Sequence, residues 1–371
     1  MRVAIHFECL VAVFFACIVC GSALADWPMT RGDSASRGVA KDSLPVPLDM
    51  IWQYRLEGLG FDSGPIIVGS TVFAADADGN VVALSLESGN EIWKRKLDTG
   101  FMASPAWNDG MLFLGDLDGV IRALEPATGE EKWQYNAERE IDAGANFFGD
   151  KVLVTSQSGS LIALDRHRGN LLWQYETDDQ LQCGPTLVNN LTFLGGCDQH
   201  LHVIDVETGQ PFVEKIPISS PTGSTPSATE SLVLVPNHQG QIWAFEIPSF
   251  QLRWKFENQQ IATEFKNSVA VGNEIVVAAS GNRRLFALDL ESGNLIWQQT
   301  LRRRVESSPL IAGNQVVVAG TDGRVALFDL QSGSELWMDE LKGSFLGSPA
   351  VAHGRIVVAS DRGEITCFGQ K

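Results

Sequence analysis

Residues 86–93 read Leu86-Glu87-Ser88-Gly89-Asn90-Glu91-Ile92-Trp93, and a related stretch follows as Ala127-Thr128-Gly129-Glu130-Glu131-Lys132-Trp133. In both stretches a Gly lies four residues before a Trp. The same spacing recurs along the chain with a period near forty residues, which indicates tandem repeats of one structural unit. The repeated Trp residues are Trp52, Trp93, Trp133, Trp173, Trp254, Trp297 and Trp337, and Val213 takes the place of the missing one. The repeated Gly residues are Gly89, Gly129, Gly169, Gly209, Gly293 and Gly333, with Phe250 as a replacement.

Each repeat unit has the pattern of four short β-strands. Apolar β-branched runs end at tight Asp-Gly turns such as Asp78-Gly79 and Asp118-Gly119, and this dipeptide is a strong hairpin signal. Four-stranded units in tandem are typical of β-propellers. The small residue that opens each unit occurs eight times, at Ser63, Ala103, Ala143, Cys183, Ser224, Asn267, Ser307 and Gly347. We therefore predict an all-β fold, an eight-bladed β-propeller of four-stranded blades.

The Trp-bearing strand is out of phase with the rest of the repeat. It begins at Ile51-Trp52, before the first complete unit, and is missing after Phe368. We predict that residues 51–56 supply the outer strand of the last blade, because this closure removes an open sheet edge. The predicted divisions are a signal peptide at 1–25, a leader segment at 26–50 and the propeller at 51–371.

The N-terminus has the features of a secretory signal. Arg2 precedes an apolar run over residues 10–19, and Ala23-Leu24-Ala25 forms a small-x-small cleavage site. We expect cleavage near Ala25 and a periplasmic or secreted protein. A lipoprotein acylated at Cys17 or Cys20 is the alternative. No other segment is expected to span a membrane.

The formal net charge of −17 disfavours binding to nucleic acid or to anionic lipid, because such a surface repels phosphate groups. We expect a monomer. Three cysteines remain after residue 25. Cys183 and Cys197 lie seven residues on either side of Asn190, so a hairpin brings them nearly opposite. A disulfide or two free thiols are both open, while Cys367 is expected to be buried and unpaired.

The Gly-x-x-x-Trp pattern resembles the tryptophan-docking motif of the pyrroloquinoline-quinone (PQQ)-like repeat family. The segment Trp27-Pro28-Met29-Thr30-Arg31-Gly32-Asp33 is similar to the leader that precedes the first blade in that family. The resemblance covers almost the whole chain after residue 25. It implies an eight-bladed fold that serves both quinone dehydrogenases and non-enzymatic scaffolds, among them the propeller of the outer-membrane protein assembly machine.

The resemblance implies that the enzymes of the family hold PQQ on a calcium ion, with a vicinal Cys pair, a catalytic Asp and long inserted loops. This chain has no adjacent cysteines. The runs 76–79 and 116–119 contain Asp-x-Asp-Gly, for which turn formation is the alternative to calcium binding. Cys183, Cys197, His200 and His202 could imitate a zinc set, although ordinary surface positions explain them as well.

We therefore expect no catalytic residue, no cofactor and no metal. The favoured function is a non-enzymatic, extracytoplasmic binding or scaffold propeller with a protein or peptide partner in the cell envelope. The alternative is a small PQQ- or metal-dependent oxidoreductase.

A partner site is predicted at one end of the propeller axis. One apolar residue precedes most unit openings, and the residue after it should face the mouth of the axial channel. The predicted mouth residues are Asp62, Met102, Asp142, Gln182, Gly223, Lys266, Glu306 and Leu346. The loop Arg302-Arg303-Arg304 lies on the same predicted face. It is either a solvated loop or an anchor for a carboxylate-bearing partner, because Arg pairs bidentately with carboxylates.

Overall fold

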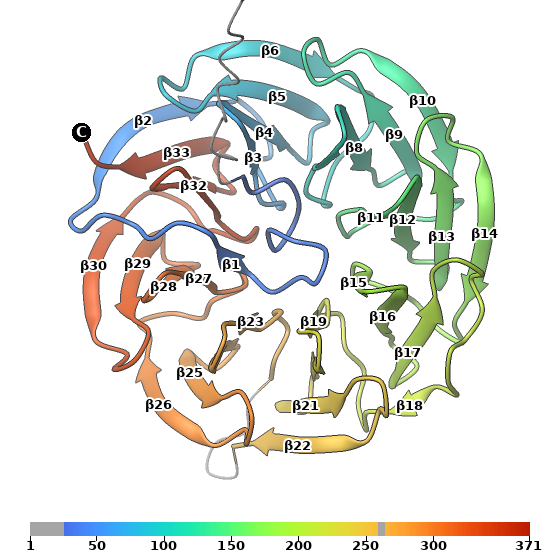
Figure 1. Ribbon diagram of the computed structural model, residues 1–371. Coiled ribbons are helices and arrows are strands. Elements are labelled where there is room, and N and C mark those ends of the chain that lie inside the picture. Colours follow the sequence, from blue (N-terminus) through green and yellow to red (C-terminus); the bar gives the residue numbers. More distant parts are fainter. Residues whose placement is uncertain (1–25, 259–263) are drawn as a thin grey trace, which may run out of the picture.

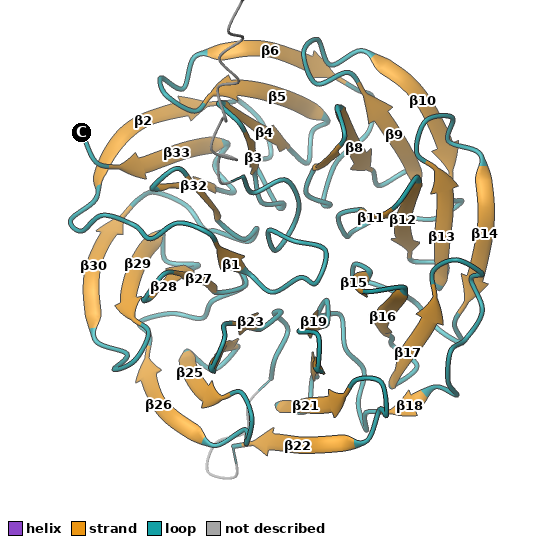
Figure 2. Cartoon of the chain, viewed as in Figure 1, coloured by secondary structure: helices purple, strands orange, loops and turns teal. Residues whose placement is uncertain are grey.

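The computed structural model describes residues 26–258 and 264–371, and within them the fold consists of strands and loops (Figure 2). Eight antiparallel sheets stand around a central axis as the blades of a propeller (Figure 1). The predicted all-β, eight-bladed architecture is confirmed. The predicted signal peptide, residues 1–25, lies outside the described residues.

Each blade has four strands, ordered from the axis outward. Blades 1 to 4 comprise β3 (Ile66–Val68), β4 (Thr71–Ala75), β5 (Asn80–Ser85) and β6 (Glu91–Lys96); β7 (Ala106–Asn108), β8 (Met111–Gly115), β9 (Val120–Leu124) and β10 (Glu131–Asn136); β11 (Asn146–Phe148), β12 (Lys151–Ser156), β13 (Ser160–Asp165) and β14 (Leu171–Glu176); and β15 (Thr186–Val188), β16 (Leu191–Gly195), β17 (His200–Asp205) and β18 (Ile216–Pro217).

Blades 5 to 7 repeat this plan, and blade 8 takes its outer strand from the other end of the chain. They comprise β19 (Ser227–Ala228), β20 (Leu232–Pro236), β21 (Gln241–Glu246) and β22 (Leu252–Glu257); β23 (Ala270–Val271), β24 (Ile275–Ser280), β25 (Arg284–Asp289) and β26 (Leu295–Thr300); β27 (Leu310–Ala312), β28 (Gln315–Ala319), β29 (Arg324–Asp329) and β30 (Glu335–Glu340); and β31 (Ala350–Ala352), β32 (Arg355–Ala359), β33 (Glu364–Gly369) and β2 (Asp49–Arg55).

The ring is closed by β2, as predicted. This strand pairs antiparallel with β33, from Asp49 opposite Gly369 to Arg55 opposite Glu364. It begins two residues earlier and ends one residue earlier than the predicted segment 51–56. The two ends of the propeller sequence therefore meet in blade 8, and the outer edge of β33 is paired instead of being left open.

The repeated Trp residues join each blade to the next. The ring of each Trp packs against the following blade, and its indole N–H donates to a backbone carbonyl there at 2.8 to 3.0 Å. The bonds run from Trp52 to Leu86, Trp93 to Pro126, Trp133 to Arg166, Trp173 to Val206, Trp254 to Leu290, Trp297 to Leu330 and Trp337 to Leu48. Each contact buries aromatic area and satisfies the indole donor at once.

Each of the six repeated Gly residues is required by the Trp of the preceding blade. Gly169 has φ +70°, and a Cβ added there would lie 2.5 Å from the Trp133 ring. Both the left-handed backbone and the close ring contact exclude a larger residue. The other repeated Gly residues have φ near +70° and similar ring contacts.

Blade 4 departs from the repeat at Val213, where the Trp is missing. Its outer strand β18 has only two residues, and Val213 lies outside it. In blade 5 the Gly position is taken by Phe250, which packs with Val213 in one apolar cluster. Phe250 therefore fills space that the absent Trp leaves open, and the two substitutions compensate each other.

Of the two alternatives left open for Cys183 and Cys197, the structure has the free thiols, and Cys367 is free as well. The turn at Asn189-Asn190 has two residues, so Val188 pairs with Leu191 and Thr186 with Phe193. Extending this register sets Cys183 opposite Gly196 rather than Cys197. The Cys183 thiol instead donates to the Gly195 carbonyl at 3.1 Å. A shift of one residue points neighbouring side chains to opposite sheet faces.

Replacing Gly169 by Ala tests Trp docking. Gly110 is the matched control, because it has φ +79° and no heavy atom within 4 Å of an added Cβ. Gly110→Ala should lower the free energy of unfolding by about 1–2 kcal/mol through backbone strain alone. Gly169→Ala should lower it by a further ~1–3 kcal/mol, because the new methyl group displaces the Trp133 ring. Equal losses for the two variants in urea unfolding would contradict the docking role.

Thiol counting tests the corrected cysteine assignment. Burial raises the pKa of Cys183 to about 12 and that of Cys367 to about 11, and neutral buried thiols react slowly. Protein from residue 26 onward, unfolded without reductant, should take up three alkyl groups per chain by mass spectrometry. Native protein should label at half-buried Cys197 before the other two. Uptake of a single alkyl group after unfolding would show that two of the three cysteines form a disulfide.

Candidate functional site

All eight predicted mouth residues line one cavity on the propeller axis, of about 190 Å³. The apolar residue before most of them is fully buried, as at Phe61, Phe101 and Phe345. Burial of this residue between blades turns the next residue toward the axis. The resulting rim combines carboxylates, amides and the apolar side chains of Met102 and Leu346, and Met102 is 43% exposed.

Two rim carboxylates have no cation beside them in the described structure. Burial, with the nearby charge of Asp361, raises the pKa of Asp62. Burial also raises the pKa of Asp142, although a hydrogen bond from Gln157 opposes the shift. The other rim charges are paired: Lys266 lies 3.4 Å from Glu264, and Glu306 lies 2.8 Å from Arg304.

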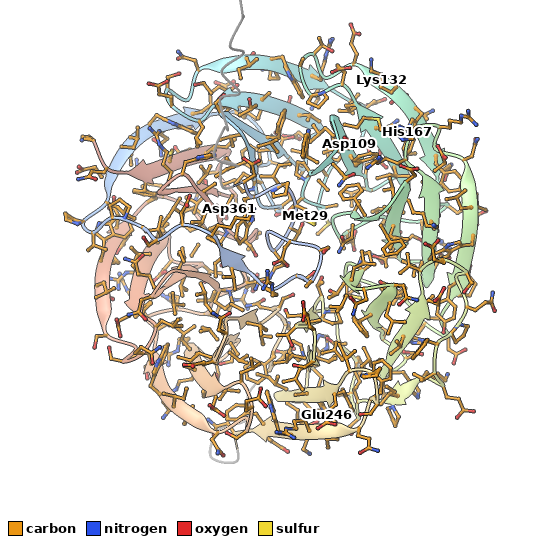
Figure 3. The ribbon with its side chains drawn as sticks, in the orientation of Figure 1. Met29, Asp109, Lys132, His167, Glu246 and Asp361 are labelled. Atoms are coloured by element: carbon orange, nitrogen blue, oxygen red, sulfur yellow. The ribbon has the colours of Figure 1, made fainter. Side chains whose placement is uncertain are left out.

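The opposite end of the channel is occupied by the leader, whose course the sequence did not reveal. Residues 27–42 run across the centre of the ring (Figure 1) and hydrogen-bond to all eight blades. Met29 lies near the axis in Figure 3. In most blades the residue that hydrogen-bonds to the leader lies five positions after the rim residue in the sequence, as Leu187 does after Gln182 and Ile311 after Glu306. Five strand residues span about 16 Å, so the leader and the mouth lie at opposite ends.

Leader residues bind the inner strands through their backbone carbonyls. The carbonyls of Ser34, Ala35, Arg37 and Gly38 accept from the N–H groups of Leu187, Ala228, Val271 and Ile311 in blades 4 to 7. A two-residue strand β1 (Val39–Ala40) then pairs parallel with β27. These bonds make the leader part of the propeller.

Arg31 holds the leader in the channel. Its side chain is 1% exposed, and its two terminal nitrogens donate to the carbonyls of Pro309 and Val269 at 2.9 and 2.8 Å. Burial lowers the pKa of Arg31 to about 9. A Cβ on Gly38 would lie 2.0 Å from the guanidinium. Any residue larger than Gly at this position would therefore clash with the Arg31 side chain.

The Asp-x-Asp-Gly runs form turns. The carboxylate of Asp76 accepts from the backbone N–H groups of Asp78 and Asn80 and from the Asn80 amide, at 3.1, 2.7 and 2.7 Å. Asp116 makes the equivalent backbone bonds and pairs with Arg122 at 3.0 Å. Their oxygens are engaged in holding the turn, which supports the turn interpretation.

His200 and His202 lie near Asp198. His202 is 2% exposed and bridges the Tyr175 hydroxyl at 3.0 Å and the Asp198 carboxylate at 3.0 Å. Burial opposes ionisation of Asp198, but His202 and His200 hold its pKa below the usual value. The described residues contain no group of three or more His, Cys, Asp or Glu arranged to hold a metal ion.

The structure pairs two of the three residues in the predicted Arg loop. Arg302 lies 3.1 Å from Glu340, and Arg304 pairs with Glu306. Exposed Arg303 has no ion pair within residues 26–258 and 264–371. The loop borders two further hollows, of about 180 and 510 Å³, and the larger one shares Glu306 and Leu346 with the axial mouth.

Among the described residues there is no helix with the length and hydrophobicity of a membrane span. The search of curated proteins found no match to this chain. Solved structures match over most of it. BamB from Moraxella catarrhalis has 21% identity and a TM-score of 0.76, covering 87% of this chain and 98% of its own.

Quinoprotein enzymes have the same fold. A europium-containing methanol dehydrogenase gives a TM-score of 0.78 at 14% identity, covering 93% of this chain and 98% of its own. The quinohemoprotein alcohol dehydrogenase of Comamonas testosteroni gives 0.79 at 15% identity, covering 93% and 81%. These similarities show the fold alone. The family model described as outer membrane protein assembly factor BamB matches residues 49–256 and 238–337. The repeats, the docked Trp residues and this match together show that the chain belongs to the BamB-like family of PQQ-like repeat propellers.

Proposed function

We propose that this protein is a non-enzymatic scaffold of the cell envelope that binds a protein partner on the face surrounding the axial mouth. After removal of the signal peptide near Ala25 it would reside in the periplasm or outside the cell. Membership of the BamB-like family supports this proposal.

The observation that carries the proposal is the blocked channel. The leader occupies one end and Arg31 lies beneath the mouth, so the axis offers a hollow closed at one end instead of a through passage. The rim presents exposed Met102 and half-buried Leu346 among the carboxylates Asp62 and Asp142. Such a mixture of apolar and charged groups is typical of a protein interface.

The residues do not fit the PQQ group that the dehydrogenase neighbours suggest. The axial cavity of about 190 Å³ is smaller than the roughly 300–1,000 Å³ of pockets for drug-sized ligands. The leader fills space below it, and no two cysteines are adjacent in the chain.

The oxidoreductase alternative can be tested directly. Purified protein incubated with PQQ and Ca²⁺, then passed through a desalting column, should retain no quinone absorbance. Retention of one equivalent of PQQ would overturn the scaffold proposal.

Site-specific photocrosslinking in the source cells tests the scaffold proposal. A photoreactive amino acid at Met102 should give an adduct with one discrete envelope protein. The same residue at Ile92, which is 53% exposed on the outer strand of blade 1, should not give that adduct.

The double variant Asp62→Asn, Asp142→Asn should lose most of the Met102 adduct while keeping its melting temperature. Both carboxyls have a pKa raised by burial, so the folded state disfavours their ionised forms and Asn removes that cost. Absence of a specific adduct at Met102, or an adduct unaffected by the double variant, would contradict a partner site at the mouth.

A further inference from the structure

A hollow of about 180 Å³ lies between blades 6 and 7 beside the Arg302–Arg304 loop. Its apolar lining comes from buried Val305, Val318 and Phe328, together with Ala326 and Met338. Its polar lining includes Arg302, Arg303, Asp322 and Arg324. The sequence analysis singled out the loop but not this hollow.

The hollow lies where two facing positions of the repeat carry Gln and Ala, in place of the bulkier pairs found at three other blade interfaces. One position lies two residues after the docked Trp and faces the next blade. There it meets the third residue of the third strand of that blade. Three of these pairs are bulky: Tyr135 with Ile162, Tyr175 with His202 at 5.8 Å between ring centroids, and Phe256 with Phe286 at 5.6 Å. Between blades 6 and 7 the pair is Gln299 and Ala326, and both line the hollow.

Ala326 is the smallest residue at its position in the eight blades. The equivalents are Val82, Arg122, Ile162, His202, Trp243, Phe286 and Thr366. The space filled by an aromatic ring in the neighbouring interface of blades 5 and 6 is therefore open between blades 6 and 7. An apolar cavity of about 150 Å³ accommodates benzene, so a hollow of this volume can accept a single aromatic side chain.

Charges of both signs lie at the rim of the hollow, which is lined by Asp322 and Glu335 as well as by Arg302, Arg303 and Arg324. One carboxylate oxygen of Glu340 serves both Arg302, at 3.1 Å, and Arg324, at 3.2 Å. Asp322 lies 3.7 Å from Arg324 without a hydrogen bond. Exposed Arg303 adds a cation that has no ion pair among the residues described. An incoming carboxylate would pair with Arg303.

We propose that this hollow binds an aromatic side chain of the partner protein, held by an acidic residue next to it that pairs with Arg303. The inference rests on the proposed scaffold function and adds the chemistry of the partner. A larger hollow joins this pocket to the axial mouth, since it shares Arg302 and Arg303 with the pocket and Glu306 and Leu346 with the mouth. One extended segment of a partner can therefore contact both sites.

Short capped peptides test the pocket. The probe is acetyl-Gly-Asp-Phe-Asp-Gly-amide, with one control that has Ala for Phe and another that has Lys for both Asp. Titration followed by NMR should show that the probe binds at least about tenfold more tightly than either control. No binding of the probe at millimolar concentration, or equal binding of the Ala control, overturns the proposal.

Variants assign the binding to this pocket. Ala326→Phe introduces the side chain that Phe286 provides at the equivalent position of blade 6, and it should fill the hollow. Probe binding should weaken at least about tenfold, and the melting temperature should stay unchanged or rise. If this variant fails to fold, Ala326→Ile fills the hollow with the smaller side chain that Ile162 provides in blade 3, and it should weaken probe binding in the same way. Arg303→Ala should weaken binding severalfold. Arg139→Ala is the matched control, because Arg139 is exposed at the equivalent loop position beside the filled interface of Tyr135 and Ile162.

Failure of the pocket proposal can be distinguished from failure of the scaffold proposal. If Ala326→Phe leaves both probe binding and the Met102 adduct unchanged, the pocket inference is wrong while the scaffold stands. If the Met102 adduct never forms but the probe binds and responds to Ala326→Phe, the pocket stands and the partner site at the mouth is wrong.

Discussion

The contact between a Trp ring on one blade and a Gly on the next is the constraint on which the ring depends. It couples three requirements in one place: a left-handed Gly, a flat ring against it, and an indole N–H bonded to a carbonyl of the following blade. No blade supplies both partners, so the contact forms only when neighbouring blades are in register. Because β2 brings Trp52 to blade 1 from blade 8, the same contact also seals the join between the two ends of the sequence.

Two departures from the repeat show how the ring tolerates variation. Loss of the Trp at Val213 is matched by Phe250 in the next blade, so the volume between blades 4 and 5 stays filled. The pair Gln299 and Ala326, which contains no aromatic side chain, is not matched in this way, and a hollow remains. Close packing normally penalises such space. The compensated substitution is explained by packing alone, whereas the uncompensated one, beside Arg303, is the basis of the proposed aromatic pocket.

Much of the fold was predictable because its signals are local and periodic. The Trp and Gly spacing, the opening small residues and the phase of Trp52 were enough to predict eight blades and their closure. The positions of the rim residues followed from strand alternation after Phe61 and its equivalents. The cysteine register failed because a two-residue turn has its centre between Asn189 and Asn190, whereas the prediction placed it on Asn190. The course of the leader was not predictable, since its bonds are made by backbone carbonyls to residues spread along the chain from Ile67 to Ile311.

The leader decides which part of a shared architecture is available for function. The same eight blades occur in dehydrogenases and in BamB, so the blades themselves do not distinguish enzyme from scaffold. Here the strands converge on a segment of the chain's own backbone, and the two terminal nitrogens of Arg31 donate to the carbonyls of Pro309 and Val269. A channel closed in this way has little volume for a ligand, and the groups left unpaired lie at its mouth and along the loops around it. Under the proposed scaffold function, a partner is therefore recognised on the face, where it needs no access to the interior.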